Sequence, residues 1–330
     1  MSPISADDNR AGPGARRLTA PIVLGALLAA GAVRGAGLDL RLEGAFRDAS
    51  LKRDVGAVCR DVLGFYTSRV GPEPALGRKP IAVCQAPDGC PRACLDRLPD
   101  EYKVNITCLY TRYYSQQVYQ LAHESGHVWA DPYRSAGWFA ESVMEAMSLL
   151  ALGAMAEKWA EAPPFENWKD YARHFAAYRE DQVKRSLARM AVASAEDVPR
   201  WVRERLPDLI RRGEAGRPTQ HAAAVLVEDL FRRHPKAWGA LRSLGGATER
   251  GVTDFAKWTA LARPEERPLV QALAEAFGPA TEQQQERTSA DDADVTRPVR
   301  ASCRRTGGSG PARASSARPW PPGGAGSGYP

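Results

Sequence analysis

Apolar residues recur at a spacing typical of helices along most of the chain. From about residue 45 to 69 they return every three or four positions, which predicts an amphipathic helix that ends near Gly71 and Pro72. Two short runs of β-branched and aromatic residues, 79–84 and 102–110, predict strands separated by a loop rich in Pro, Gly and Cys. Further helices are expected at residues 113–129, 138–160, 165–192, 197–213, 219–234 and 252–277, the last broken near Pro264. The pattern therefore predicts an α+β fold, with a small sheet first and helices after it.

The N-terminal segment has the layout of a secretory signal. Residues 18–33 carry no charge and follow Arg16 and Arg17, and the small residues Ala30 and Ala32 suit a cleavage site. The alternatives are an uncleaved membrane anchor and, without export, a buried helix or a disordered leader. We expect export, which makes this an extracytoplasmic protein (secreted, periplasmic or cell-surface) with no stable membrane insertion beyond such an N-terminal anchor.

The C-terminal segment differs in composition from the rest of the chain. From about Thr281, glutamines are followed by acidic residues, then by arginines, and then by a run of Gly, Pro, Ser and Ala that ends at Pro330. Such a segment buries too little apolar surface to fold, so we expect it to be disordered. The predicted organisation is a leader, a first domain that contains the sheet, a helical subdomain and a disordered tail, at residues 1–36, 37–160, 161–280 and 281–330.

Composition and charge narrow the function classes. The 330 residues are 44% hydrophobic and 25% charged, which are ordinary values for a globular protein and unlike those of a collagen or a polytopic membrane protein. The net charge of +6 is concentrated at the ends, because residues 1–36 and 281–330 each contribute +2. The middle of the chain has no basic stripe with interleaved aromatics, so nucleic acid is not an expected partner.

Four cysteines lie close together in the loop-rich region. Cys84, Cys90, Cys94 and Cys108 fall within 25 residues, a density that predicts disulfides in an oxidising compartment and agrees with export. Their spacing does not determine how they would pair. The alternative is a structural zinc site, although the two closely spaced cysteine pairs typical of such sites are missing.

The chemistry of the chain is concentrated in the HExxH motif His123-Glu-Ser-Gly-His127. On a helix, residues four positions apart share a face, so both imidazoles can bind one cation. Glu124 lies beside them and can take a proton from a water molecule that a zinc ion activates. On the next predicted helix, Glu141 and Glu145 are again four positions apart, so one can bind the metal while the other accepts a hydrogen bond from a ligating histidine. Two histidines, one glutamate and an open fourth position are typical of a catalytic zinc site rather than of a structural one.

These residues resemble the gluzincin metallopeptidases, the relatives of thermolysin and the aminopeptidases. In that family a glutamate on the following helix is the third ligand, and Trp138-Phe-Ala-Glu141 with Glu145 is similar to the stretch that supplies it and its supporting acid. The resemblance covers about residues 102–156. It implies a zincin-like catalytic domain with a small sheet and an HExxH active-site helix, followed by a mainly α-helical subdomain. It further implies one zinc ion per chain and these roles: His123, His127 and Glu141 as zinc ligands, Glu124 as general base and then proton donor, and Glu145 as the residue that orients an imidazole.

Two parts of the resemblance are incomplete. The gap of thirteen residues between His127 and Glu141 is shorter than in the best-known members of the family. Because Glu145 comes closer to their spacing, either glutamate can be the third ligand. The resemblance also implies that the strand at 102–110 is the edge on which an extended substrate lies, and that a Tyr or His stabilises the oxyanion. Candidates for this last role by residue type alone, none of them assigned by its spacing, are Tyr171, His174, Tyr178, His221 and His234.

The sequence therefore predicts an enzyme, an exported zinc metallopeptidase that hydrolyses a peptide or protein substrate with Glu124 as general base. The first alternative is a zinc-binding module without proteolytic activity, in which the site braces the fold and the C-terminal helices bind a partner. The second is a helical interaction protein in which HESGH is accidental and His123 and His127 are ordinary core residues. The motifs carry no signal for cleavage specificity, for endo- or exopeptidase action or for oligomeric state.

Overall fold

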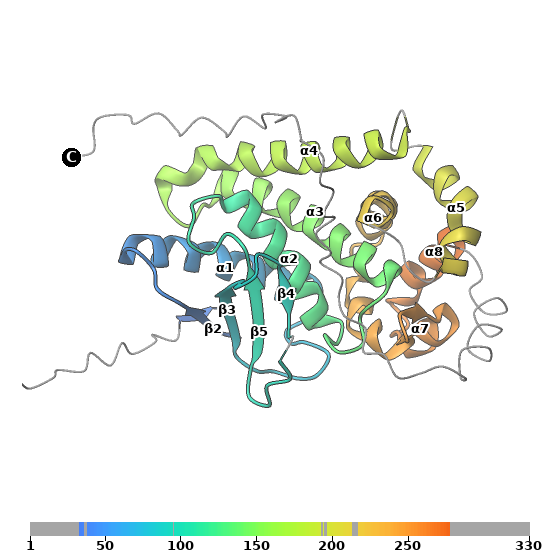
Figure 1. Cartoon of the computed structure of the whole chain (residues 1–330), viewed down its shortest axis with the longest axis horizontal. Helices are drawn as coiled ribbons and strands as arrows, with labels where there is room; N and C mark the ends of the chain where they lie inside the picture. The colour runs from blue at the N-terminus through green and yellow to red at the C-terminus, as the bar shows by residue number, and fades with distance from the viewer. Residues whose placement is uncertain are drawn as a thin grey trace, which may run out of the picture.

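A computed structural model describes residues 33–277 apart from residues 36–37, 95, 193, 195–196 and 213–216. The fold is α+β, as the sequence predicts, with a five-stranded sheet near one end of the molecule and a group of C-terminal helices at the other (Figure 1). The predicted signal sequence and C-terminal tail lie almost wholly outside the described residues. The described part begins within the last residues of the expected leader, where Val33–Gly35 forms a strand.

The sheet is mixed, with parallel strands at its centre and an antiparallel strand at each edge. The strand order is β1-β2-β3-β5-β4, and the strands are β1 (Val33–Gly35), β2 (Leu38–Glu43), β3 (Ile81–Gln85), β4 (Arg92–Ala93) and β5 (Tyr102–Ile106). The parallel register pairs Leu40 with Ile81 and Ile81 with Tyr102. The sequence pattern predicts β3 and β5 but misses β1, β2 and β4. The predicted strand 102–110 is too long, because β5 ends at Ile106 and turns follow it.

The helices agree closely with the predicted ranges. They are α1 (Ala49–Arg69), α2 (Tyr114–Trp129), α3 (Trp138–Glu161), α4 (Ala172–Met190), α5 (Val198–Arg212), α6 (Arg217–Arg233), α7 (Phe255–Leu261) and α8 (Arg267–Phe277). The expected break near Pro264 separates α7 from α8. Short elements that the pattern does not predict are the 3₁₀ helices η1 (Glu166–Tyr171), η3 (Trp238–Ser243) and η4 (Gly245–Ala247) and the hairpin of β6 (Thr248–Glu249) and β7 (Val252–Thr253).

Helix α1 packs against the sheet and against α2. It begins at Asp48, whose side chain accepts a hydrogen bond from the backbone N–H of Leu51 at 2.6 Å. One face of the helix carries Val55, Val62 and other apolar residues that are fully buried. Lys158 and Trp159 of α3 both donate hydrogen bonds to a single carboxylate of α1, that of Asp61. These contacts join α1 directly to α3, and both helices also pack against α2, the helix that carries the HExxH motif.

Helix α3 is the central element of the fold. It packs against α2 on one side and against α4 and α6 on the others (Figure 1). Among the described helices it is the one long and apolar enough to span a membrane. Most of its apolar stretch is buried inside the protein, as expected for the core helix of a globular fold. It therefore connects the sheet region to the C-terminal helices.

Three of the four clustered cysteines do not form the disulfides that their density predicts. Cys84, Cys94 and Cys108, like Cys59 on α1, are free thiols with buried side chains. Burial raises the pKa of each of these four thiols to about 12. Buried free cysteines act as small apolar core residues, which is the physical reason why their density in the sequence gave a wrong prediction. Within the described residues these cysteines also belong to no metal-binding group.

Candidate metal centre

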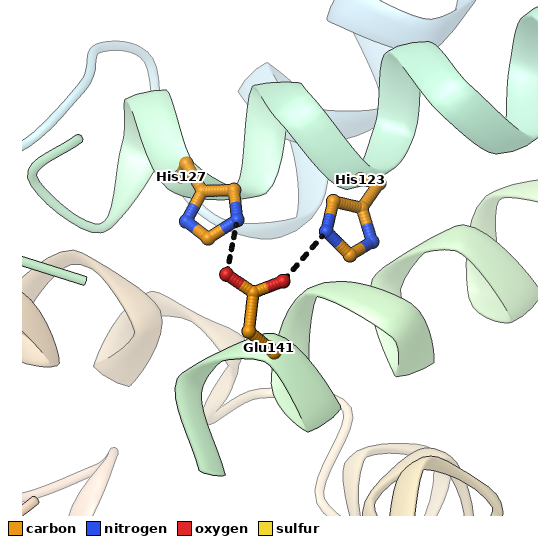
Figure 2. A group of neighbouring side chains, drawn as sticks. All are labelled: His123, His127 and Glu141. Atoms are coloured by element: carbon orange, nitrogen blue, oxygen red, sulfur yellow. Dashed lines mark hydrogen bonds and ion pairs between the residues drawn. The ribbon is translucent and has the colours of Figure 1, made fainter. Parts of the chain in front are cut away.

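Two histidines and a glutamate converge where α2 and α3 cross. His123 and His127 project from the same face of α2, and Glu141 from the first turn of α3 reaches between them (Figure 2). Nε2 of His123 lies 3.2 Å from one carboxylate oxygen of Glu141, and Nε2 of His127 lies 3.5 Å from the other. Within the described part of the chain, this is the group of His, Cys, Asp and Glu residues whose ligand atoms come close enough together to hold a metal ion.

The spacing of these atoms fits a zinc ion. One ligand atom from each of the three residues lies within 4.8 Å of the others. In a tetrahedral site with bonds of about 2.0–2.1 Å, two ligand atoms are about 3.3 Å apart, close to the separations of 3.2 and 3.5 Å found here. The donor set of two imidazoles and one carboxylate is also one that zinc prefers. Because the 3.2 and 3.5 Å distances end on different oxygens of Glu141, small side-chain rotations would let the three residues hold a tetrahedral ion with one further position.

The other ring nitrogen of each histidine has its own partner. Nδ1 of His127 lies 2.9 Å from the backbone carbonyl oxygen of Ser135, to which it can donate a hydrogen bond. Nδ1 of His123 lies 3.6 Å from a carboxylate oxygen of Glu145. With a hydrogen on Nδ1 of each ring, Nε2 is the nitrogen that faces Glu141 and that can bind a metal when it carries no proton. The geometry thus favours Glu141 as the third ligand and Glu145 as the acid that orients His123.

A glycine in the motif lets α2 and α3 approach closely. A Cβ atom on Gly126 would lie 2.4 Å from the sulfur of Met144 on α3 and 3.1 Å from the hydroxyl of Tyr66 on α1. The Tyr66 hydroxyl itself donates a hydrogen bond of 2.5 Å to the carbonyl of Ala122. The Gly126 position is therefore where three helices meet, and their close packing brings the histidines of α2 within reach of the glutamates of α3.

The connection between α2 and α3 is held by the C-terminal part of the chain. The carbonyl oxygen of Ala130, just after α2, accepts a hydrogen bond of 2.9 Å from the backbone N–H of Gly245. Gly137, just before α3, has a φ of +105° and packs so closely on Gly251 that a Cβ atom would lie 2.0 Å from the carbonyl oxygen of Gly251. The segment that supplies the Ser135 carbonyl to His127 is thus fixed at both ends.

The carboxylates and imidazoles of the site shift one another's pKa values in opposite directions. Burial alone would raise the pKa of Glu141, but the imidazoles of His127 and His123 outweigh it and hold this pKa well below its usual value. Burial would likewise lower the pKa of His123, but the carboxylates of Glu141 and Glu145 hold it well above 6.5. Both shifts favour a proton between the imidazole of His123 and the carboxylate of Glu141 in the metal-free protein. A divalent cation that binds here replaces it.

Glu124 is buried beside this group, with only 5% of its surface exposed. Burial raises the pKa of its carboxyl group, and the charges of His123 and His127 partly offset this effect. The carboxylate also has a backbone hydrogen bond with Ala93 of β4, the edge strand of the sheet. Its burial and its place beside the three candidate ligands make Glu124 the candidate for a general base.

The strand at 102–110 does not form the edge that the resemblance implies. Its ordered part, β5, lies between β3 and β4 and pairs with both. The edge is instead β4, which pairs antiparallel to β5 through Ala93 and Val104 and lies next to Glu124. Because β4 has only two residues inside a loop rich in Pro, Gly and Cys, the alternation of apolar and polar positions gave no signal for it.

The candidates for an oxyanion stabiliser lie in different surroundings. Tyr171 packs against Trp159 and His174, and its hydroxyl accepts a hydrogen bond from the backbone N–H of Ser115 at the start of α2. Tyr178 packs edge-on against the ring of Tyr119. His221 lies on α6 and contacts Glu145, and His234 directly follows the end of that helix. These contacts assign the oxyanion role to none of them.

Sequence reasoning missed three groups that support the metal-binding residues. The hydroxyl of Tyr119 hydrogen-bonds to Glu145, and because Tyr119 lies four positions before His123, the helical spacing could have identified it. The sequence offers His221 only as a candidate for stabilising the oxyanion, and no residue pattern in α6 indicates its contact with Glu145. The carbonyl of Ser135 belongs to the backbone, so no residue pattern reveals it.

Comparisons of the chain with protein-family models, with curated proteins and with solved structures give no match.

Proposed function

We propose that the chain is a zinc-dependent peptidase that hydrolyses peptide bonds. The observation that carries this proposal is the convergence of His123, His127 and Glu141 at distances that suit one zinc ion, with the buried carboxyl group of Glu124 beside them. The similarity of HExxH and the following glutamates to the gluzincin metallopeptidases, with their zincin-like fold, supports the same function. A zinc ion held by these three residues would supply Lewis-acid activation of a water molecule and of the substrate carbonyl.

Glu124 has the position and the environment to move the proton in this reaction. As a carboxylate it would accept a proton from the attacking water, and as a carboxylic acid it would donate that proton to the leaving amine. Its burial favours the neutral form and so brings its pKa closer to the pH at which both transfers occur. His123 and His127 flank it in the sequence and partly offset this effect.

The edge of the sheet supports an extended peptide as the substrate. β4 is the last strand of the described sheet, and an extended segment can pair with the backbone groups on the side of β4 that faces away from β5. Because Ala93 of β4 has a backbone hydrogen bond with Glu124, a peptide on this edge would lie next to the general base. We therefore propose β4, rather than the strand at 102–110, as the substrate-binding edge.

Export of the enzyme remains a prediction from its N-terminal sequence. The uncharged segment 18–33 after Arg16 and Arg17 supports it. The cysteines lend it less support than expected, because Cys84, Cys94 and Cys108 are free thiols.

Replacement of Glu124 by glutamine tests the proposed chemistry. Glu124→Gln keeps the size of the side chain but removes the base, so the variant should bind one equivalent of zinc and lose peptide hydrolysis. The matched control is Glu157→Gln, which changes an exposed glutamate of α3. Zinc content and the cleavage of a mixed peptide library by mass spectrometry are measured for both variants. Hydrolysis retained by Glu124→Gln would overturn the proposal, and a wild-type protein that binds zinc but cleaves no peptide would indicate a zinc-binding module instead.

A further inference from the structure

The carboxylate of Glu145 has partners from two helices besides its own. One oxygen, Oε2, lies 3.6 Å from Nδ1 of His123. The other, Oε1, accepts a hydrogen bond from the hydroxyl of Tyr119 on α2 and lies 3.3 Å from Nδ1 of His221 on α6. Since an ionised carboxylate only accepts hydrogen bonds, the His221 contact is attractive when its Nδ1 carries a hydrogen. The two oxygens of Glu145 therefore face different groups, with the metal-binding histidine on one side and Tyr119 and His221 on the other.

Glu145 needs these partners because it is buried. Only 5% of its surface is exposed, and burial on its own would raise the pKa of its carboxyl group. Hydrogen bonding to His123 and the charge of His221 outweigh this effect and lower the pKa. An ionised carboxylate in this position is stable only while its donors stay in place. The removal of one donor would allow the carboxylate to turn away from His123.

Tyr119 and His221 are themselves held in place. The ring of Tyr119 packs edge-on against Tyr178 of α4, with 5.8 Å between ring centres. The backbone carbonyl of Tyr119 accepts a hydrogen bond of 2.9 Å from the hydroxyl of Ser148 on α3. The side chain of His221 is mostly buried, with 16% of its surface exposed, on a helix that packs closely on α3. Both residues therefore reach Oε1 of Glu145 from helices that are packed against their neighbours.

We propose that Tyr119 and His221 are positioning residues of the metal site, because by holding Oε1 of Glu145 they keep its Oε2 beside Nδ1 of His123. With Nδ1 carrying the hydrogen that faces Glu145, Nε2 of His123 has its lone pair directed at Glu141 and available to a metal. This inference rests on the proposed function, since it concerns the zinc ion that His123 would bind. It assigns to α6, a helix of the C-terminal half, a direct role in the affinity of the site for metal.

The affinity for zinc separates this role from a purely structural one. If His221 and Tyr119 only help α6, α4 and α3 to pack, their replacement lowers the stability of the metal-free protein and leaves the affinity for zinc unchanged. If they position His123, the affinity falls by about 10- to 100-fold, the range typical for groups that orient a metal ligand. The affinity is measured by competition between the full-length protein and a chromogenic chelator for zinc. The stability is measured by thermal unfolding in EDTA.

The variants are chosen to remove the donors with little change in volume. Tyr119→Phe removes only a hydroxyl, and His221→Leu removes the imidazole. His221→Asn places an amide N–H close to the position of Nδ1 and should restore most of the affinity that His221→Leu loses. The matched control is His234→Leu, the same exchange just beyond the other end of α6. It is about 20 Å away along the helix axis and should leave the affinity unchanged.

The outcomes distinguish the two proposals. Weaker zinc binding by Tyr119→Phe and His221→Leu, with recovery in His221→Asn, supports the positioning role. Should His221→Leu fail to fold, Tyr119→Phe alone decides. Affinities within twofold of the wild type in both donor-removing variants overturn the positioning role, while zinc binding and peptide hydrolysis by the wild type leave the proposed function intact. A wild-type protein that binds no zinc overturns both.

Discussion

Replacement of Gly137 by alanine should damage the metal site and the stability of the fold together. Gly137 precedes α3 with a φ of +105°, and a Cβ atom there would lie 2.0 Å from the carbonyl oxygen of Gly251. With its ψ of 161°, Gly137 lies in a region that is essentially confined to glycine, where an alanine costs about 1–3 kcal/mol of backbone strain. The overlap adds about 1–3 kcal/mol, because it involves backbone atoms that cannot turn aside as a side chain does. We therefore expect Gly137→Ala to lower the free energy of unfolding by about 2–6 kcal/mol, a large part of the total for a typical domain.

The same substitution should weaken zinc binding. The backbone N–H of Glu141 donates a hydrogen bond of 2.9 Å to the carbonyl of Gly137, so a shift at Gly137 moves the first turn of α3 and Glu141 with it. Zinc sites tolerate ligand displacements of only about 0.2 Å, and relief of the overlap requires a movement several times larger. We expect the affinity for zinc to fall at least tenfold. Urea denaturation in EDTA and chelator competition for zinc measure the two effects.

Gly153→Ala is the matched control on the same helix. The nearest atom to a Cβ atom at Gly153 is Cδ of Arg179, at 3.8 Å, which is an ordinary contact. This variant should be as stable as the wild type or up to about 1 kcal/mol more stable, because alanine favours helices over glycine. Its affinity for zinc should be unchanged. The reasoning is refuted if Gly137→Ala unfolds at the same urea concentration as the wild type and binds zinc as tightly.

Two further predictions concern the metal and the buried thiols. Zinc at 1,000 times its dissociation constant should raise the free energy of unfolding of the wild type by about 4 kcal/mol and leave that of His127→Ala unchanged. Urea denaturation with and without a chelator measures the effect. Equal stabilisation of both proteins would place the metal elsewhere. Burial raises the pKa of Cys59 and Cys108 from 9.0 to about 12. Between pH 9 and pH 12 the folded protein therefore binds more protons than the unfolded chain. Its free energy of unfolding should fall as the pH rises through this range. Urea denaturation at pH 8 and pH 10 measures this fall, which should be smaller when both cysteines are replaced by alanine; an equal fall in that variant would contradict the assignment.

The central part of the site could be predicted because its geometry is local. The period of a helix alone places His123 and His127 on one face, and the next helix begins close enough in sequence to return Glu141 to them. The choice between Glu141 and Glu145 could not be made in this way, because both lie on the same face of α3. The choice depends on how α3 is rotated and placed against α2, which is determined by contacts such as the close approach at Gly126.

The features that sequence reasoning missed depend on distant parts of the chain or on backbone atoms. The contact between His221 and Glu145 joins residues on α6 and α3, and neither helix carries a pattern that indicates the other. The edge strand β4 has two residues, too few for a periodic pattern. The disulfide prediction is wrong for Cys84, Cys94 and Cys108 because it used the density of cysteines alone. Cys84 lies in β3 and Cys94 directly follows β4, where the burial of each thiol could be recognised only once the sheet was known.

The contacts of Gly245 with Ala130 and of Gly251 with Gly137 also govern when the site can form during synthesis. Each joins positions more than a hundred residues apart, so each forms only after a long loop closes. A ribosome that has released the chain up to the end of α3 has released both histidines and both glutamates, but not the residues that hold the connection between α2 and α3. The proposed metal site is therefore completed late, when nearly all of the described chain has emerged. A nascent chain should not bind zinc tightly before η4 and the β6–β7 turn have folded against the α2–α3 connection.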